Sequence, residues 1–270
     1  MTLGISTYAC SWEIGITAAP SPAPLDHFSF IRYVADLGVR VAQIADNLPL
    51  AALSTQGRKE LRSLADSLNV QIEVGTRGFT EENTDTYIRI AEEFSSPVLR
   101  MVIDRESYQP DTSQVKALLS KVAPRLENAG IILAIENHDR FRCEEFIDMI
   151  LSTNSAYVGI CMDTVNSFGA LEGPHVVIES LGPLTVNLHV KDFTVRRSSH
   201  QMGFVVDGCP AGQGQLQIPH LLSHLREFGR DPNAIIELWV NPEPTSEGTI
   251  SKERDWLRSS VAYLRTLLPD

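Results

Sequence analysis

The chain has 270 residues, of which 43% are hydrophobic and 21% are charged, and its formal net charge is -11. This composition excludes a disordered chain, and the length lies in the range where one hydrophobic core serves a single domain, expected over residues 1–270. The negative charge, with no run of Lys and Arg to offset it locally, argues against nucleic acid as a partner.

Eight short runs rich in β-branched residues follow one another along the chain. Most begin about 25 to 40 residues apart, which is the length of a strand plus a crossover helix. The pattern therefore predicts parallel strands alternating with helices. The predicted strands are 3–9, 41–45, 70–75, 98–103, 131–136, 157–163, 185–191 and 234–240.

Between these runs lie amphipathic segments with apolar residues at i, i+3, i+4 and i+7 and charged residues on the opposite face, which predict outer helices. Clear examples are 27–37, 84–94, 115–129 and 218–229. The helix ends carry the expected signals. Asp111 precedes one helix as an N-cap, and Gly38, Gly130 and Gly229 follow the ends of three others.

Eight regular βα units, with no G-x-G-x-x-G after an early strand, favour a single-domain (β/α)8 TIM barrel over an open doubly wound sheet. The chain length is also close to the ~250 residues typical of that fold. Two longer loops, 12–24 and 192–214, both follow predicted strands. We therefore expect both at the C-terminal face of the barrel, where active sites of this fold are found.

The cellular compartment is predicted from what the sequence lacks. No stretch reaches the ~18 apolar residues that span a bilayer, and no secretory leader pattern opens the chain, so we expect no membrane partner and a cytoplasmic location. The cysteines form no C-x-x-C pair, which indicates buried thiols in a reducing compartment. A reactive Cys161 beside Asp163 is the alternative. The four cysteines are Cys10, Cys143, Cys161 and Cys209.

Four residues with ligating side chains occupy the same place in four consecutive units, at or near the C-terminal end of a strand. They are Glu136 in LAIENH, Asp163 in GICMDTVN, His189 in NLHVKD and Glu237 in IIELWV. Adjacent parallel strands lie ~4.8 Å apart and a closed barrel curves them around one axis, so inward side chains at one level converge. We expect these four to share one metal ion.

Each of these residues also has a plain structural interpretation. Asp163 could cap a helix, His189 could be a satisfied interior histidine, and the two glutamates could pair with a barrel arginine. Buried acids are rare unless paired or metal-bound, so the four together favour a metal site. Three carboxylates and one imidazole make a hard donor set for one divalent cation. Mn²⁺ is the first choice, and Mg²⁺, Co²⁺ and Zn²⁺ are the alternatives.

Further residues near strand ends are candidates for binding a substrate. Arg77 and Lys191 offer positive charge to a carboxylate or phosphate, although each could instead face solvent or form an internal ion pair. His138 shares the strand parity of Glu136 and could orient a ligand or contact substrate. Trp12 could form a wall of the pocket or simply pack.

With these residues in view, the chain resembles the xylose-isomerase-like TIM-barrel superfamily, which includes ketose 3-epimerases, hydroxypyruvate isomerase, inosose dehydratase and endonuclease IV. The resemblance rests on the order Glu, Asp, His, Glu on the last four strands, in the contexts AIENH, DTVN and HVKD. It implies that Glu136, Asp163, His189 and Glu237 are the metal ligands. It also implies that Glu136 and Glu237 are the pair that moves protons.

Two positions depart from the epimerase pattern. Asn166 stands where the epimerases carry a histidine three residues after the aspartate, and Arg142 stands where they carry a glutamate. Asparagine can bind a sugar hydroxyl but cannot shuttle a proton, so both residues are candidates for substrate binding and argue against plain ketose 3-epimerisation.

The leading functional hypothesis is an isomerase or epimerase of a small sugar or sugar acid, working through a metal-stabilised enediolate. The alternative is a lyase of the same superfamily, either a decarboxylase of a 3-oxo sugar acid such as 3-oxo-isoapionate or an inosose dehydratase. An AP endonuclease is disfavoured by the acidic charge and by too few histidines. A non-catalytic sugar-binding barrel is disfavoured by the complete ligand set. A homodimer is expected as one oligomeric state, but the sequence does not decide it.

Overall fold

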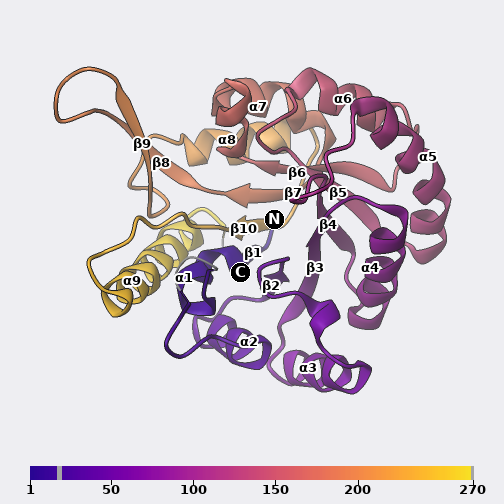
Figure 1. The fold of residues 1–270 in the computed structure, drawn as a ribbon, viewed down its shortest axis with the longest axis horizontal. Coiled ribbons are helices and arrows are strands. Elements are labelled where there is room, and N and C mark those ends of the chain that lie inside the picture. Colours follow the sequence, from indigo (N-terminus) through magenta and orange to yellow (C-terminus); the bar gives the residue numbers. More distant parts are fainter. Residues whose placement is uncertain (17–19, 269–270) are drawn as a thin grey trace.

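The computed structural model describes residues 1–16 and 20–268, and its centre is a closed barrel of eight parallel strands (Figure 1). The neighbour order around the barrel is β1-β10-β7-β6-β5-β4-β3-β2, so β1 pairs with both β2 and β10 and closes the ring. The predicted TIM barrel is confirmed. Its strands are β1 Leu3–Ser6, β2 Val41–Ile44, β3 Gln71–Arg77, β4 Val98–Val102, β5 Ile132–Glu136, β6 Val158–Asp163, β7 Thr185–Val190 and β10 Ala234–Ile236.

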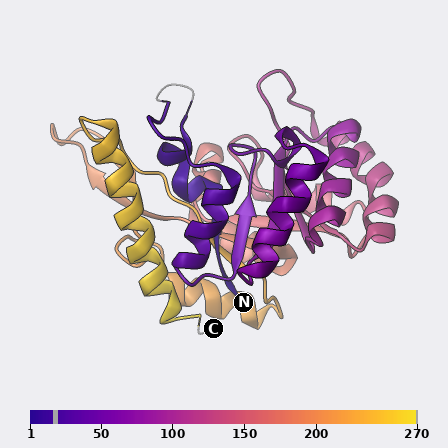
Figure 2. The same ribbon diagram turned by 90° about the horizontal axis from the view of Figure 1, so that it is seen from below.

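Helices cover the outside of the barrel, and α9 packs against α1 to complete the ring (Figures 1 and 2). Their apolar faces form the main core with the outward side chains of the strands. The α-helices are α1 Ser11–Ile14, α2 His27–Asp36, α3 Thr55–Ser67, α4 Glu81–Phe94, α5 Thr112–Ala129, α6 Cys143–Leu151, α7 Pro174–Leu181, α8 Ile218–Glu227 and α9 Ser246–Arg265. Within the described ranges, no helix is long and apolar enough to cross a membrane.

The inside of the barrel differs from the outer core. A small separate apolar cluster of Val98, Ala134 and Cys161 lies there, and buried polar side chains fill other inward positions. Ala134 and Cys161 are two residues before Glu136 and Asp163, so the predicted inward parity of β5 and β6 is confirmed. The predicted burial of the cysteines is confirmed as well, since all four thiols are free and buried.

The predicted helix caps are present. The Asp111 side chain accepts a hydrogen bond from the backbone N–H of Gln114, and Gln114 Oε1 accepts one from the backbone N–H of Asp111. The glycines at the ends of helices adopt left-handed backbone geometry, with φ of 69° at Gly38, 67° at Gly130 and 71° at Gly229. Residues with a Cβ avoid this conformation, so these glycines stop the helices where the sequence indicated.

The segment 192–214 was expected to be a loop, and this expectation is wrong. It contains an antiparallel hairpin of β8 Asp192–Arg197 and β9 Phe204–Cys209, which projects from the barrel (Figure 1). The β-branched residues here are largely exposed, so they lack the buried run that marked the barrel strands. In the other long loop, 12–24, part of the predicted segment falls on residues 17–19, outside the described residues.

Two strands end several residues earlier than predicted. β1 stops at Ser6, because a 3-10 helix over Thr7–Cys10 takes over, and β10 ends at Ile236. Glu237 therefore lies just after its strand, although its backbone N–H still bonds to the carbonyl of Val190 on β7. The shift leaves Glu237 at the C-terminal face of the barrel.

The backbone conformation and surroundings of two glycines predict opposite effects of an alanine substitution on the free energy of unfolding. Gly130→Ala should lower the free energy of unfolding by about 1 kcal/mol, because alanine is strained at a positive φ. Gly57→Ala, inside α3 and with only ordinary contacts around an added Cβ, should raise it by about 0.5–1 kcal/mol. Urea unfolding of the two variants checks this. Equal shifts of the same sign would contradict the assignment of Gly130 as the α5 stop.

Candidate metal centre and substrate pocket

The four predicted ligands meet at the C-terminal mouth of the barrel. Glu136 ends β5, Asp163 ends β6, His189 lies one residue before the end of β7, and Glu237 follows β10. Their side chains are at most 1% exposed. The structure therefore brings together all four residues that the sequence singled out.

A register shift between β6 and β7 aligns two of them. Ile160 pairs with Thr185, but Cys161 pairs with Asn187, so β7 contains one extra residue at this point. Because of this bulge Asp163 stands opposite His189. A continuous register would place Leu188 there instead, with its side chain on the other face of the strand.

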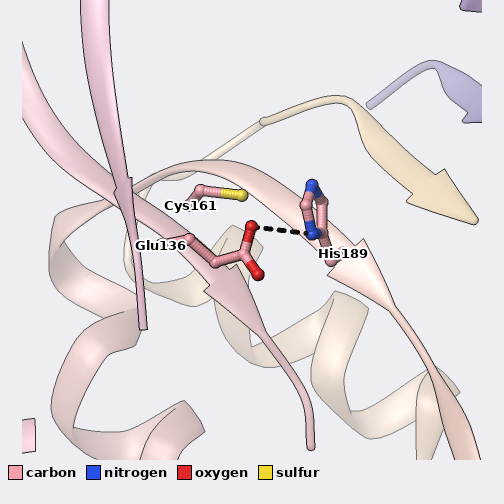
Figure 3. Close-up of side chains that lie close together, drawn as sticks. All are labelled: Glu136, Cys161 and His189. Atoms are coloured by element: carbon pink, nitrogen blue, oxygen red, sulfur yellow. Dashed lines mark ion pairs between the residues drawn. The ribbon is translucent and has the colours of Figure 1, made fainter. Parts of the chain in front are cut away.

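The Nδ1 atom of His189 is the centre of the cluster. It lies 3.4 Å from Glu136 Oε2, 3.7 Å from Asp163 Oδ2 and 3.3 Å from Glu237 Oε1. The Cys161 thiol lies beside Glu136 and His189, and Figure 3 shows the glutamate pointing toward the imidazole. Three carboxylates thus surround one imidazole nitrogen in a dry environment.

These residues fit a divalent cation. His189 Nε2 is occupied by Gln43 Oε1 at 2.7 Å, whereas Nδ1 is buried and, among the described residues, has no hydrogen-bond partner. Burial opposes a charged imidazole, but the neighbouring Cys161, Glu237 and Glu136 raise the pKa of His189 well above its usual range. The cluster thus carries excess negative charge, which a dication at Nδ1 would offset.

Lys191 supplies positive charge at the same place. Its Nζ lies 2.7 Å from Asp163 Oδ2 and 2.9 Å from Glu237 Oε2. Burial opposes the ammonium form, but the charges of Asp163, Glu237 and Glu136 outweigh it and raise the pKa of Lys191. Lys191 is therefore a fixed cation at the mouth of the barrel.

Asn166 connects the lysine with a ligand. Its Nδ2 donates to Glu136 Oε1 at 2.8 Å, and its Oδ1 lies 3.3 Å from Lys191 Nζ as an acceptor. Its backbone N–H donates to Asp163 Oδ1 at 2.8 Å. Asn166 thus lies against the acid cluster, as expected for the position where it replaces a histidine.

A cavity of about 450 Å³ opens beside the acid cluster. Trp12 and Trp239 line it together with Asn166, Lys191 and Glu237. Trp12 is fixed by its Nε1, which donates to the backbone carbonyl of Val240 at 2.8 Å. The remaining lining residues are Tyr8, Ser11, Ile16, Val165, Leu238, Val240, Asn241 and Pro242. The predicted position of Trp12 in the pocket wall agrees with this cavity.

Two other candidates lie outside this lining. The Arg77 side chain is 41% exposed and its Nε is 3.5 Å from Asp46, which matches the alternative interpretation of this residue as exposed or ion-paired. His138 Nδ1 lies 3.2 Å from Oδ2 of its neighbour Asp139.

Arg142 also lies outside the cavity lining, at the N-terminus of α6. Its side chain is 60% exposed and its Nε is 3.5 Å from Glu172 Oε1. This residue therefore stands against a neighbouring acid rather than beside the four ligands.

Arg100 on β4 is the barrel arginine that pairs with a glutamate of the cluster, since it bonds to Glu136 and lies 2.8 Å from Asp46. Two other polar residues around the cluster were missed by the sequence analysis. Ser6 donates to Glu237 Oε1 at 2.9 Å. Gln43 reaches His189 from β2. The only signal in the sequence was a polar residue at an inward strand position, as with Gln43 in VAQIA, which by itself specifies no partner.

Comparison with known proteins places this site in a family. Residues 31–260 match the family described as "Xylose isomerase-like TIM barrel". The chain is 33% identical over 269 residues to 3-oxo-isoapionate decarboxylase of Pectobacterium atrosepticum, covering 100% of this chain and 97% of that protein.

Solved structures show the same fold. A D-psicose 3-epimerase determined in the presence of D-fructose superposes with a TM-score of 0.76 at 16% identity, covering 100% of both chains. A xylose isomerase-like TIM-barrel protein of Mycobacterium smegmatis in complex with magnesium gives 0.68 at 13% identity, covering 97% of each chain. With the family match and the full-length relative, the chain belongs to the xylose isomerase-like TIM-barrel family and is an enzyme.

Proposed function

We propose that this enzyme decarboxylates a small 3-oxo sugar acid, of the kind represented by 3-oxo-isoapionate. The relative of that name matches over the full length at 33% identity, whereas the epimerase resembles this chain in fold at 16%. The observation that carries the proposal is the Lys191 ammonium, which lines the cavity 2.7 Å from one ligand carboxylate and 2.9 Å from another. A fixed cation at that place suits an anionic substrate.

We assign Glu136, Asp163, His189 and Glu237 as the ligands of one divalent cation, with Mn²⁺ as the first choice because the donor set is rich in oxygen. When bound, the cation would act as a Lewis acid that stabilises the negative charge developing on a substrate carbonyl oxygen. The magnesium complex of the M. smegmatis relative supports the choice of a hard dication.

The reaction needs few protein groups. Loss of CO₂ from a 3-oxo acid breaks the C1–C2 bond, and its electron pair moves into a C2–C3 double bond as negative charge develops on the C3 oxygen. C2 then takes up one proton while the C3 carbonyl re-forms. No base has to remove a C–H proton first, which fits Asn166 in place of a proton-shuttling histidine. We assign the returning proton to Glu136 or Glu237.

Other residues position the substrate. Lys191 binds the carboxylate and orients the C1–C2 bond, and Asn166 binds a hydroxyl beside Glu136. Trp12 and Trp239 cover the cavity and reduce its access to water. These roles use the residues that line the cavity, so Arg77, Arg142 and His138 have none in this scheme.

An isomerase or epimerase is the second candidate. It is favoured by the full-length structural likeness to D-psicose 3-epimerase and by the two glutamates, Glu136 and Glu237, in the acid cluster. In that reaction one glutamate would remove a proton from carbon and the other would return it.

Proton NMR in D₂O distinguishes the two reactions. We expect Mn²⁺-free, Mg²⁺-loaded enzyme to release CO₂ from a 3-oxo sugar acid and to leave one deuterium at the former C2. Ketoses in the same panel should stay unlabelled. Deuterium entering ketoses without loss of a carboxylate would replace the proposal with isomerase or epimerase chemistry.

Substitution of a residue proposed to bind the cation should remove most of the bound metal. Purified wild-type enzyme should hold about one Mn²⁺ per chain, and His189→Ala and Glu237→Gln should lose most of it, because each removes a donor atom from the cluster. Elemental analysis after dialysis measures this. Glu179→Gln, a change of a half-exposed glutamate on α7, is the matched control. Full metal content in His189→Ala would disprove the site.

Lys191→Gln should lower kcat/KM for the 3-oxo acid about 10- to 100-fold, because hydrogen bonds to charged groups contribute about 1.5–3 kcal/mol. Metal content, measured in parallel, should stay unchanged. Arg77→Gln serves as the comparison, since both residues were candidates for the anionic group. A loss with Arg77→Gln and none with Lys191→Gln would assign the carboxylate contact to Arg77.

A further inference from the structure

A buried polar network lies directly beneath the acid cluster, and the proposed mechanism does not use it. It consists of Gln43 on β2, Glu73 on β3 and Asn187 on β7, all 0% exposed, with Asn233 at its far end. Burying a carboxylate and two amides inside a barrel is costly unless each polar atom is matched. The pattern of donors and acceptors shows that this network fixes the orientation of its amide groups.

Glu73 orients the amides around it. Its Oε2 accepts from Gln43 Nε2 at 3.1 Å and from Asn187 Nδ2 at 2.9 Å, and its Oε1 accepts from Asn233 Nδ2 at 2.7 Å. A carboxylate can only accept, so each amide has to turn its nitrogen toward Glu73. The amide oxygens of Gln43 and Asn187 therefore point elsewhere.

The second N–H of Gln43 is also occupied, because Nε2 donates to Asn187 Oδ1 at 2.9 Å. Only Oε1 remains, and it lies 2.7 Å from His189 Nε2. A flipped amide would set an oxygen against the Glu73 carboxylate and the Asn187 oxygen, with no proton between them. Gln43 thus presents an acceptor to His189, and Nε2 of the imidazole has to carry a proton.

We infer that Gln43, held by Glu73, is the positioning residue for the metal-ligating histidine. By keeping the proton on Nε2, it leaves the Nδ1 lone pair directed at the point between the three carboxylates. It also fixes the rotation of the ring. This role rests on the metal centre in the proposed function, and it adds two residues, Gln43 and Glu73, that are not themselves assigned as ligands of the cation.

Two substitutions test the role. Gln43→Leu removes the acceptor with little change of volume, and Glu73→Gln removes the charge that orients Gln43. Titration calorimetry with Mn²⁺ should show the Kd rising about 10- to 100-fold in both, the usual effect of removing the partner of a ligating histidine. Ser260→Ala is the control, because it removes a buried hydrogen bond to Ala211 N elsewhere in the barrel. It should keep the wild-type Kd.

A second readout separates positioning from simple packing. In ¹⁵N spectra of metal-free protein at an alkaline pH where the imidazole is neutral, His189 should have a protonated Nε2 and an unprotonated Nδ1, whereas Gln43→Leu should show a mixture of the two tautomers. A purely structural role would lower the melting temperature of the variants but leave the Kd and the His189 spectrum unchanged. That result would overturn the inference.

The outcome for this network can be separated from the outcome for the reaction. If wild-type enzyme binds Mn²⁺ and the variants bind it weakly, the positioning role stands even when no 3-oxo acid is decarboxylated. If the variants bind Mn²⁺ as tightly as wild type while decarboxylation proceeds, the positioning role fails and the proposed function stands. Wild-type enzyme that binds no Mn²⁺ would overturn both.

Discussion

Three buried carboxylates held against one imidazole nitrogen are the constraint on which the rest of this structure depends. Glu136, Asp163 and Glu237 lie within 3.3–3.7 Å of His189 Nδ1, and none is more than 1% exposed. Such a group is unfavourable without compensating charge, because burial removes the water that would solvate it. Two cations supply part of that charge. Lys191 pairs with Asp163, and Arg100 pairs with Glu136. His189 Nδ1, which has no hydrogen-bond partner within residues 1–16 and 20–268, lies among the three carboxylates and fits a divalent cation.

The barrel produces this convergence through its closure and its register. Parallel strands deliver their C-terminal residues to one rim, and closure of β1 onto β10 turns that rim into a ring. The bulge at the β6–β7 pair then aligns Asp163 with His189. Below this level the lumen holds the Gln43 and Glu73 network instead of a purely apolar layer, and this network reaches the ligating histidine from the opposite wall. Two strands that carry none of the four cluster residues, β2 with Gln43 and β3 with Glu73, therefore help to support the ring.

The residues around the acid cluster influence which reaction is favoured. Ligand sets alone do not separate proton transfer at carbon from decarboxylation, since both develop charge on a carbonyl oxygen. Asn166 differs from the residue expected in a site built to shuttle protons, because its side chain cannot carry a proton. Lys191 adds a cation beside the cavity. Trp12, which follows β1, and Trp239, which follows β10, line that cavity.

The sequence by itself determined the barrel and the four residues that meet at its mouth. Strand and helix periods are local properties, and residues at strand ends of consecutive parallel units must share a rim, so Glu136, Asp163, His189 and Glu237 could be found without coordinates. Only the tertiary structure decided which of the other polar residues belong to the site. Lys191 lines the cavity whereas Arg77 pairs with Asp46, and Gln43 reaches a histidine 146 positions away. These contacts depend on barrel curvature, register and the length of side chains that cross the lumen, and local sequence spacing does not determine any of these.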